Sequence, residues 1–421
     1  MKLAVVGGGS TYTPELVDGI ARLTGDIKVT ELVLVDPDQA RLSVVGPFSA
    51  RIMARYGHPA AVTWTSDLDA AADGAGAVLL QLRVGGQATR HRDETWPLEC
   101  GCIGQETTGA GGFAKALRTV PVVLNVAERV RERAEPGAWI IDFTNPVGIV
   151  TRALLDAGHR AIGLCNVAIG YQRLFASMLN VAPEQVDLDH VGLNHLTWER
   201  AALVGGADKL PGLLAEHGEE IAGHTGLPLA VTEAIRAVPS YYLRYYWAHD
   251  AVVEEERGQQ TRAQAVAEIE RQLLEMYADP SLDSKPELLS HRGGAFYSEA
   301  AVALLASLVT DAGDRQVVNV RNNGTLPFLA DEAVIEVSAN IGAGGATPVP
   351  VAPVSPLMSG LIAHVSAYEE LAIDAAVRGG RDQVAKALLA HPLVGQFDLA
   401  GRLTDRLLAE NAAFLPWASG Q

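Results

Sequence analysis

The chain has 421 residues, of which 48% are hydrophobic and 20% charged, and its formal net charge at pH 7 is −17. This length allows two or three domains, and the composition is typical of a globular protein rather than a disordered one. The acidic excess would repel nucleic acid and anionic membranes, so we expect neither as a partner. Three cysteines are too few for a disulfide framework, and no segment approaches the roughly 20 apolar residues of a membrane span, so we expect a cytoplasmic protein.

A glycine cluster follows the first apolar run of the chain. Residues 2–6 are apolar and β-prone, and a helical pattern opens at Pro14. Strand, glycine turn and helix form the context of a dinucleotide fingerprint, in which backbone N–H groups approach the pyrophosphate. Gly7 and Gly9 match the first two glycines of G-x-G-x-x-G, but Tyr12 occupies the third position, so we expect looser packing of the helix on its strand. The predicted cofactor-binding residues of this segment are Gly7, Gly9, Ser10 and Thr11.

The second predicted strand, residues 32–35, ends in Asp36. A carboxylate at this point can bind the ribose hydroxyls and repels a 2′-phosphate, so the predicted cofactor is NAD rather than NADP. The alternative is an ordinary glycine turn followed by a strand-end acid.

Three further apolar runs continue the alternation of strands with helices, at residues 77–82, 139–143 and 161–164. Five such strands predict an α/β fold with a Rossmann-like, doubly wound parallel sheet and a ligand at the carboxyl ends of the strands. The rhythm breaks after residue 187. We therefore predict a NAD-binding domain over residues 1–166 and a C-terminal α+β substrate and metal domain over residues 167–421. No flexible linker is visible, so the two should pack tightly with the site between them.

The C-terminal part shows both kinds of pattern. Strands are predicted over residues 196–203, 317–320 and 333–337, and helices over residues 263–276, 293–308, 357–377, 382–389 and 399–414.

A cysteine and a histidine are candidates for metal binding. Cys165 follows the fifth predicted strand, and His195 follows Asn194 within a later apolar run. Thiolate and imidazole are suited to divalent transition metals, and water or substrate would complete the coordination. A lone cysteine is more often a small buried hydrophobe, and a lone histidine is more often a core or surface residue. The pair alone therefore leaves both interpretations open.

Seven segments are similar, in order, to motifs of glycoside hydrolase family 4. The likeness spans nearly the whole chain and is closest to members that act on 6-phospho-β-glucosides. The segments are residues 104–109 (GQETTG), 143–148 (FTNPVG), 165–167 (CNV), 192–196 (GLNHL), 242–246 (YLRYY), 292–294 (RGG) and 322–324 (NNG).

This resemblance implies a glycosidase that uses NAD⁺ and a divalent metal, typically Mn²⁺, instead of two flanking carboxylates. NAD⁺ would take hydride from C3 of the sugar, which acidifies the proton at C2. A base would remove that proton, the leaving group at C1 would depart, water would add, and the hydride would return. The metal would polarise the C2 and C3 oxygens.

The resemblance also implies roles for individual residues. Cys165 and His195 would bind the metal. Asn145, which we also place at the cofactor, and Asn194 would hold sugar hydroxyls or orient ligands.

Tyr242 matches the family's catalytic base, although the adjacent Tyr241 leaves the register open by one residue. The free pKa of a phenol is about 10, so deprotonation near pH 7 would need a nearby cation. Asn166, directly after the cysteine, takes the place of the aspartic acid that family members cleaving α-linked substrates use as a general acid. Because an amide cannot donate that proton, Asn166 implies β-linked substrates. We also expect Asn166 to contact the sugar in the catalytic site.

The substrate phosphate requires cationic groups. Arg83, Arg90, Arg92 and Arg292 are candidates, and the alternative for each is a solvated surface ion pair. Glu106 is expected to bind the sugar.

The expected partner is thus a small phosphorylated glycoside, and alanine-rich helices suggest a homodimer or homotetramer. Two alternatives remain. Residues 144–147 also resemble a loop of malate and lactate dehydrogenases, which would make the chain a 2-hydroxy-acid dehydrogenase. The fold alone would also suit a non-catalytic NAD-binding sensor.

Overall fold

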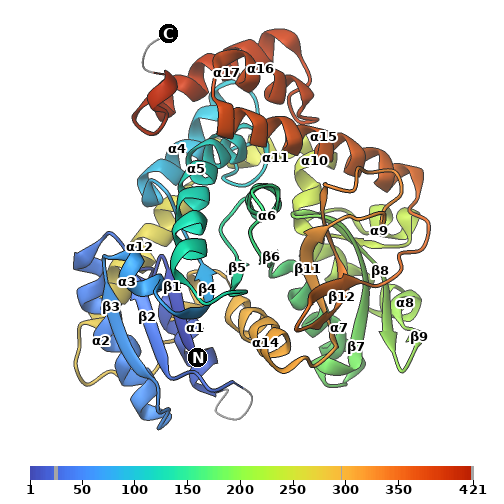
Figure 1. The fold of residues 1–421 in the computed structure, drawn as a ribbon. Coiled ribbons are helices and arrows are strands. Elements are labelled where there is room, and N and C mark those ends of the chain that lie inside the picture. Colours follow the sequence, from blue (N-terminus) through green and yellow to red (C-terminus); the bar gives the residue numbers. More distant parts are fainter. Residues whose placement is uncertain (23–26, 295, 419–421) are drawn as a thin grey trace.

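The computed structural model describes residues 1–22, 27–294 and 296–418. Among these residues, six parallel strands lie in the order β3-β2-β1-β4-β5-β6 (Figure 1). This is the strand order of doubly wound dinucleotide-binding sheets, so the predicted α/β fold is confirmed. The strands are β1 (Lys2–Val6), β2 (Glu31–Val35), β3 (Ala61–Thr65), β4 (Ala75–Leu80), β5 (Trp139–Asp142) and β6 (Ala161–Gly163). The helices are α1 (Thr13–Arg22), α2 (Gln39–Arg55), α3 (Leu68–Ala72), α4 (Gly86–Glu99), α5 (Gly109–Arg133), α6 (Val147–Asp156) and α7 (Val167–Leu179).

Strand β3 is absent from the sequence prediction, which contained five strands. It lies at the edge of the sheet beside β2, and all of its side chains are exposed or partly exposed. An edge strand of this kind carries no apolar run, so hydrophobicity alone does not reveal it.

The C-terminal half extends the same sheet. Strand β11 pairs antiparallel with β6, and β12, β7, β8 and β10 follow outward. The sheet is therefore continuous across the two halves, and the division of the chain at residue 166 stays a prediction. The further strands are β7 (Val186–Leu193), β8 (Leu196–Val204), β9 (Ala207–Asp208), β10 (Val238–Pro239), β11 (Asp314–Arg321), β12 (Val334–Gly342) and β13 (Gly345–Pro348). The further helices are α8 (Leu210–Thr225), α9 (Leu229–Ile235), α10 (Arg244–Trp247), α11 (His249–Glu256), α12 (Arg262–Tyr277), α13 (Leu288–His291), α14 (Tyr297–Thr310), α15 (Pro356–Arg378), α16 (Arg381–Ala390) and α17 (Phe397–Asn411).

One predicted helix begins later than expected. The pattern predicts it from residue 293, but α14 starts at Tyr297. Gly293 and Gly294 have φ angles of 91° and 87°, which a right-handed helix does not allow. Residue 295 lies outside the described residues.

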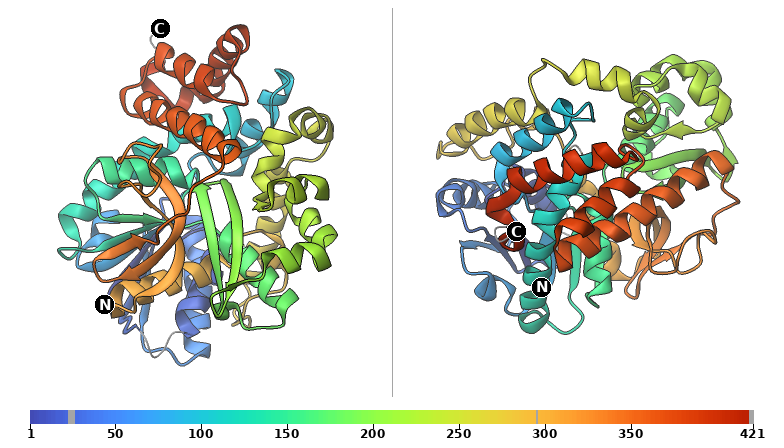
Figure 2. Two further views of the ribbon diagram at one scale, coloured as in Figure 1. Left: turned by 90° about the vertical axis from the view of Figure 1, so that its right-hand side faces the viewer. Right: turned by 90° about the horizontal axis from the view of Figure 1, so that it is seen from above.

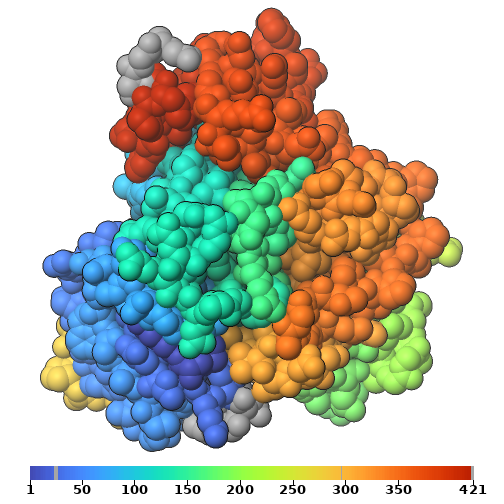
Figure 3. Space-filling view, viewed as in Figure 1, coloured from blue at the N-terminus to red at the C-terminus, as the bar shows by residue number. Residues whose placement is uncertain are grey.

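Helices α15, α16 and α17 lie at the top of the molecule in Figure 1 and form a raised lobe in the space-filling view (Figure 3). Seen from above, they cross over the N-terminal half (Figure 2). Within the three described ranges, no helix combines the length and apolar character needed to cross a membrane.

Helices from the C-terminal half pack onto the N-terminal half. Helix α14 contacts α1, and α12 contacts α2 and α4. Two tyrosines bind across this interface beside the glycine loop: the Tyr12 hydroxyl donates to the Gly294 carbonyl oxygen at 2.6 Å, and the Tyr277 hydroxyl donates to the Thr11 carbonyl oxygen at 2.9 Å. The glycine loop is therefore held by both halves.

A buried ion pair joins α4 to α5, and its arginine also bonds to the top lobe. On α5, Arg118 makes two bonds to Asp93 of α4, from Nη2 to Oδ2 at 2.5 Å and from Nη1 to Oδ1 at 3.1 Å. Its Nη1 also donates to Asn411 at the end of α17. The side chains of Arg118 and Asp93 are 1% and 2% exposed, so neither charge can be compensated by water if its partner is removed.

We predict that Arg118→Ala lowers the free energy of unfolding by about 3 kcal/mol or more, because it leaves Asp93 buried without its cation. Urea denaturation followed by circular dichroism measures the loss. The matched control is Arg406→Ala, which removes an exposed bond between α17 and Glu99 and should cost less than about 1 kcal/mol. Equal losses in the two variants would contradict the prediction.

Candidate active site

The two candidate metal donors follow the consecutive strands β6 and β7, which are not neighbours in the sheet. Cys165 follows β6 after one residue. Asn194 and His195 form the two-residue turn of the β7–β8 hairpin, because Leu193 pairs directly with Leu196. His195 has a φ angle of 63°, in the left-handed region that a tight hairpin turn requires.

His195 is buried beside an aromatic ring. Its imidazole stacks on Tyr242, with ring centroids 3.7 Å apart and planes 6° from parallel. Burial lowers the pKa of His195 to about 4, so the ring is neutral at physiological pH. The Nδ1 atom is buried without a hydrogen-bond partner among the described residues. A neutral imidazole with an unpaired nitrogen is competent to bind a metal ion.

Cys165 is also buried, and three groups surround its sulfur. Burial and the Glu336 carboxylate raise the pKa of the thiol, whereas hydrogen bonds from the Val167 amide, Tyr297 and Asn194 oppose the rise. Within the described residues, no set of three or more His, Cys, Asp or Glu side chains could hold a metal ion. A metal ion held by Cys165 and His195 alone would leave coordination positions for substrate or water.

A cleft of about 1170 Å³ runs from the glycine loop to this region. Most of the residues that the sequence analysis singled out line it. These are Gly7, Ser10, Asp36, Arg83, Arg90, Glu106, Asn145, Asn166, Tyr242 and Arg292. The structure thus brings the predicted cofactor, sugar and phosphate residues to one continuous surface.

At the nucleotide end, Asp36 fixes the glycine loop. Its Oδ2 accepts the Gly9 N–H at 3.1 Å, and its Oδ1 accepts the Asp38 N–H at 2.9 Å. A Cβ atom at Gly9 would lie 3.0 Å from Asp36 Oδ2, and one at Gly8 would lie 2.8 Å from the Val35 nitrogen. The contact with the Val35 backbone leaves no room for a side chain, so the loop needs glycine at position 8, whereas at Gly9 the Asp36 side chain would have to shift.

Arg292 reaches the glycine loop from the C-terminal half. Its Nε donates to Thr11 Oγ1 at 2.7 Å, and its Nη2 lies 3.3 Å from Ser10 Oγ. Glu270 of α12 pairs with Arg292 at 2.9 Å and with Arg41 at 3.4 Å. The two arginines therefore outnumber the one carboxylate that pairs with both of them, and Arg41 also interacts with the Asp36 carboxylate.

A second set of cations surrounds Glu106. Lys115 lies 2.6 Å from its Oε2, Arg90 lies 3.1 Å from its Oε1, and Arg83 makes a further short contact. Burial raises the pKa of Glu106, but these three cations outweigh burial and hold it well below the ordinary value. Burial also lowers the pKa of Lys115 to about 7. The cluster keeps a net positive charge that faces the cleft.

The residues that line the cleft do not include the candidates Gly9, Thr11, Cys165, Asn194 and His195, nor Tyr241 and Arg92, whose contacts lie elsewhere. Tyr241 is 41% exposed and its hydroxyl bonds to Arg244, whereas the next residue, Tyr242, lines the cleft. Arg92 is exposed and donates to Thr89 on its own helix at 3.3 Å.

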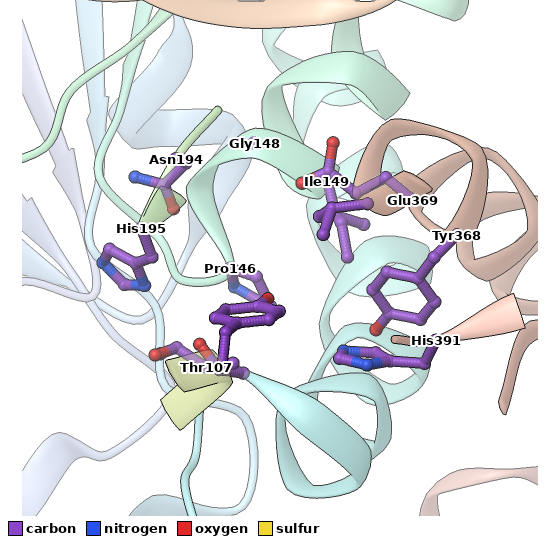
Figure 4. Close-up of a pocket in the computed structure, with 12 residues that line it drawn as sticks. Thr107, Pro146, Gly148, Ile149, Asn194, His195, Tyr368, Glu369 and His391 are labelled. Carbon is purple, nitrogen blue, oxygen red and sulfur yellow. The ribbon is translucent and has the colours of Figure 1, made fainter. Parts of the chain in front are cut away.

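Asn194 and His195 face a second cavity, of about 20 Å³, behind the cleft. Figure 4 shows them on one side of it, with Tyr368, Glu369 and His391 on the other. A space of this size holds about one water molecule.

Comparison with known proteins assigns the family. The family 4 glycosyl hydrolase model matches residues 2–181, and the model of the family 4 C-terminal domain matches residues 190–394. The chain belongs to glycosyl hydrolase family 4. This membership favours the glycosidase interpretation over a 2-hydroxy-acid dehydrogenase or a sensor.

Relatives of this family 4 chain match over nearly its full length. It is 36% identical to a probable 6-phospho-β-glucosidase of Bacillus subtilis (strain 168), with 99% of this chain and 97% of the relative covered. It is 33% identical to the 6-phospho-β-glucosidase of Escherichia coli (strain K12), with 99% and 96% covered. The structure of the 6-phospho-β-glucosidase from Thermotoga maritima with manganese, NAD⁺ and glucose 6-phosphate superposes with a TM-score of 0.93 at 34% identity, covering 99% of both chains.

The sequence analysis missed several residues of this family 4 site, among them Lys115, Tyr297 and Glu336. Lys115 and Tyr297 line the cleft, and Glu336 lies behind Asn194. Lys115 and Glu336 are lone charges within apolar runs, which is a signal that could have identified them. Tyr297 offers no such signal.

Glu369 lines the small cavity of this family 4 enzyme, and its ionisation should make the stability of the chain depend on pH. Burial raises the pKa of Glu369 from the ordinary value of 4.5 to about 8, so the folded chain keeps a proton that the unfolded chain loses. As the pH rises through this window, the wild-type chain loses up to about 1.4 kcal/mol of stability per pH unit from this group. Glu369→Gln has the shape of the protonated acid and should avoid the loss.

Thermal unfolding between pH 5 and 8 measures the effect, and the midpoint of Glu369→Gln should exceed that of the wild type by a margin that grows with pH. The control is Glu370→Gln, since Glu370 is an exposed partner of Arg152. The difference between the unfolding midpoints of Glu370→Gln and the wild type should not change with pH. A constant margin for Glu369→Gln would show that the carboxyl group is already ionised in the folded chain.

Proposed function

We propose that this family 4 glycosyl hydrolase cleaves 6-phospho-β-glucosides with NAD⁺ and a divalent metal ion such as Mn²⁺. The observation that carries the proposal is the single cleft that joins the glycine loop, Tyr242 and three partly buried arginines. The relatives add support, because two of them are 6-phospho-β-glucosidases and the Thermotoga maritima structure contains manganese, NAD⁺ and glucose 6-phosphate.

The residues of the glycine loop fit a dinucleotide. Gly7 and Ser10 line the cleft just before α1, where backbone N–H groups favour a pyrophosphate, and Gly9 and Thr11 belong to the same loop. Asp36 and Asn145 line the cleft on either side, and the Asp36 carboxylate disfavours the 2′-phosphate of NADP.

The donor set fits a divalent ion. Cys165 and His195 would hold it, since both are buried and the His195 Nδ1 has no hydrogen-bond partner among the described residues. When bound, NAD⁺ accepts a hydride from C3 of the sugar and returns it, and the metal ion polarises the C2 and C3 oxygens.

Tyr242 is the proposed base at C2. Its hydroxyl lines the cleft within hydrogen-bonding reach of Thr107, and its ring is fixed by stacking on His195. Burial and the neighbouring Cys165 raise the pKa of Tyr242 well above the ordinary value. Its Oη can therefore remove the C2 proton at neutral pH only beside a cation, which the proposed metal ion would supply.

Arginines supply the proposed phosphate site. Arg83, Arg90 and Arg292 all line the cleft, and Arg83 acts on the charges of both Glu106 and Glu270. Guanidinium groups bind phosphate oxygens in pairs, which suits a 6-phosphate. The sugar hydroxyls are proposed to bind Glu106, Asn145, Asn166 and Asn194.

Asn166 sets the proposed anomer preference. An amide at this position cannot protonate a leaving alkoxide, so cleavage of an α-linked substrate would lack general acid catalysis. We therefore propose β-linked substrates.

We also propose a domain division, a cellular location and an oligomeric state. The chain would divide into a NAD-binding domain over residues 1–166 and a substrate and metal domain over residues 167–421. A cytoplasmic homodimer or homotetramer would be supported by the low cysteine content and by exposed apolar side chains on the top lobe, such as Phe397, Val377 and Leu357.

The proposed function predicts a specific pattern of activity. p-Nitrophenol should be released from p-nitrophenyl 6-phospho-β-glucoside only with both NAD⁺ and Mn²⁺, and the plain β-glucoside should react at least tenfold more slowly. Cellobiose 6-phosphate should be cleaved about a hundredfold faster than maltose 6-phosphate, because general acid catalysis contributes at least that factor. Full activity without NAD⁺, or equal rates on the two disaccharides, would contradict the proposal.

A pair of adjacent variants tests the base. Tyr242→Phe should lower kcat by a hundredfold or more while leaving the affinity for NAD⁺ unchanged, because the variant lacks only the proton acceptor. Tyr241→Phe is the matched control and should keep wild-type kcat, since Tyr241 is exposed. Wild-type hydrolysis in D₂O should place deuterium at C2 of the product, as NMR can measure. Product without deuterium at C2 would exclude proton removal at that carbon.

A further inference from the structure

A buried carboxylate lies behind the two candidate metal donors. Glu336 on β12 is 1% exposed. Its Oε1 bonds His190 Nε2 at 3.1 Å, and its Oε2 accepts Asn194 Nδ2 at 3.0 Å and Asn319 Nδ2 at 2.9 Å. The three bonds reach two different strands, since His190 and Asn194 belong to β7 and its turn whereas Asn319 belongs to β11.

Strand order explains why a side chain is needed at this position. Cys165 follows β6 and His195 follows β7, but β11 and β12 lie between these strands in the sheet. Glu336 is in register with Gly192 of β7 on one side and with Asn319 of β11 on the other. Asn319 is in turn in register with Gly163 of β6. Glu336 therefore lies on the line that connects the two donor-bearing strand ends.

Asn194 connects this carboxylate to the thiol. The Asn194 side chain bonds Glu336 and also lies within hydrogen-bonding reach of the Cys165 sulfur. Next along the chain is His195. A rotation of the Asn194 amide would therefore disturb both the sulfur and the turn that carries the imidazole.

Each described group that bonds Glu336 is a hydrogen-bond donor. Asn194 and Asn319 present amide N–H groups. His190 lies between two carboxylates, with its Nδ1 2.6 Å from Glu199 Oε1. Burial lowers the pKa of His190, but Glu199 and Glu336 outweigh burial and raise it to about 10, so both ring nitrogens carry protons. Only a carboxylate accepts from all of these donors at once.

We propose that Glu336 is a positioning residue for the metal centre: it fixes the Asn194 amide against Cys165 and holds the β7 turn that carries His195. This inference rests on the proposed function, because it assumes that Cys165 and His195 bind the metal. Groups that orient metal ligands from behind typically change metal affinity by 10- to 100-fold when they are replaced.

The test is the isosteric variant Glu336→Gln, whose amide N–H₂ would oppose the donors of Asn194, Asn319 or His190. Mn²⁺ is titrated into the full chain saturated with NAD⁺, and free Mn²⁺ is followed by electron paramagnetic resonance. The Kd for Mn²⁺ should rise at least tenfold, while the Kd for NAD⁺ stays within twofold of the wild type.

The matched control is Glu199→Gln. Glu199 is equally buried, at 1% exposure, and bonds the opposite nitrogen of His190, but it has no bond to Asn194 or Asn319. A Gln oxygen can still accept from His190 Nδ1, so the Kd for Mn²⁺ should stay within twofold. Equal weakening in both variants would assign Glu336 a general structural role and overturn the inference.

Further outcomes separate the inference from the function beneath it. Wild-type Mn²⁺ affinity in a folded Glu336→Gln variant would overturn the positioning role alone. A wild-type chain that binds no Mn²⁺ would overturn both the metal assignment and the inference. If Glu336→Gln does not fold, Glu336→Asp keeps the charge but withdraws the carboxylate by one methylene, and it should still raise the Kd for Mn²⁺; an unchanged Kd would overturn the role.

Discussion

The arrangement of the cleft depends on one narrow junction in the sheet, where β6 meets β11. The two strands pair at Gly163 and Asn319, and there the parallel sheet becomes antiparallel. A Cβ atom at Gly163 would lie 2.2 Å from Thr151 Oγ1 and 2.9 Å from the Asn319 Cβ. Only glycine permits this approach. Because of this junction, the loop after the parallel strand β6 and the turn after the antiparallel strand β7 lie at the same edge of the sheet. The loop carries Cys165, and the turn carries His195.

The same arrangement of charges occurs at two places along the cleft. Glu106 and Glu270 are each buried among several cations, and each neutralises only part of their charge. Charges that line a cleft with low-dielectric walls are screened less than charges on an open surface, so the remaining positive charge acts over a longer range. A chain with a net charge of −17 can in this way attract an anionic sugar while its surface repels other anions.

The sequence revealed the site where local rules decide position. Asp36, Asn145 and Cys165 follow apolar strands, and the carboxyl ends of parallel strands share one edge, so their convergence could be predicted. Contacts made across the sheet could not. The bond between Glu336 and Asn194 depends on the pairing of β12 with β7, which no periodicity in the sequence specifies. Likewise, Tyr241 and Tyr242 lie in the same short 3-10 turn, Tyr241–Leu243. No pattern in the sequence shows that the first ring is exposed and that the second lines the cleft.

The long-range contacts of the glycine loop determine when, during synthesis, the loop can reach its final conformation. Its contacts with Gly294, Tyr277 and Arg292 join residues 282, 266 and 281 positions apart. During synthesis the first βαβ unit leaves the ribosome long before these partners exist, and contacts of such separation form late. The nucleotide loop therefore reaches its final shape only when the second half of the chain has folded against it. A half-made chain holds the fingerprint of a dinucleotide site without the contacts that complete it.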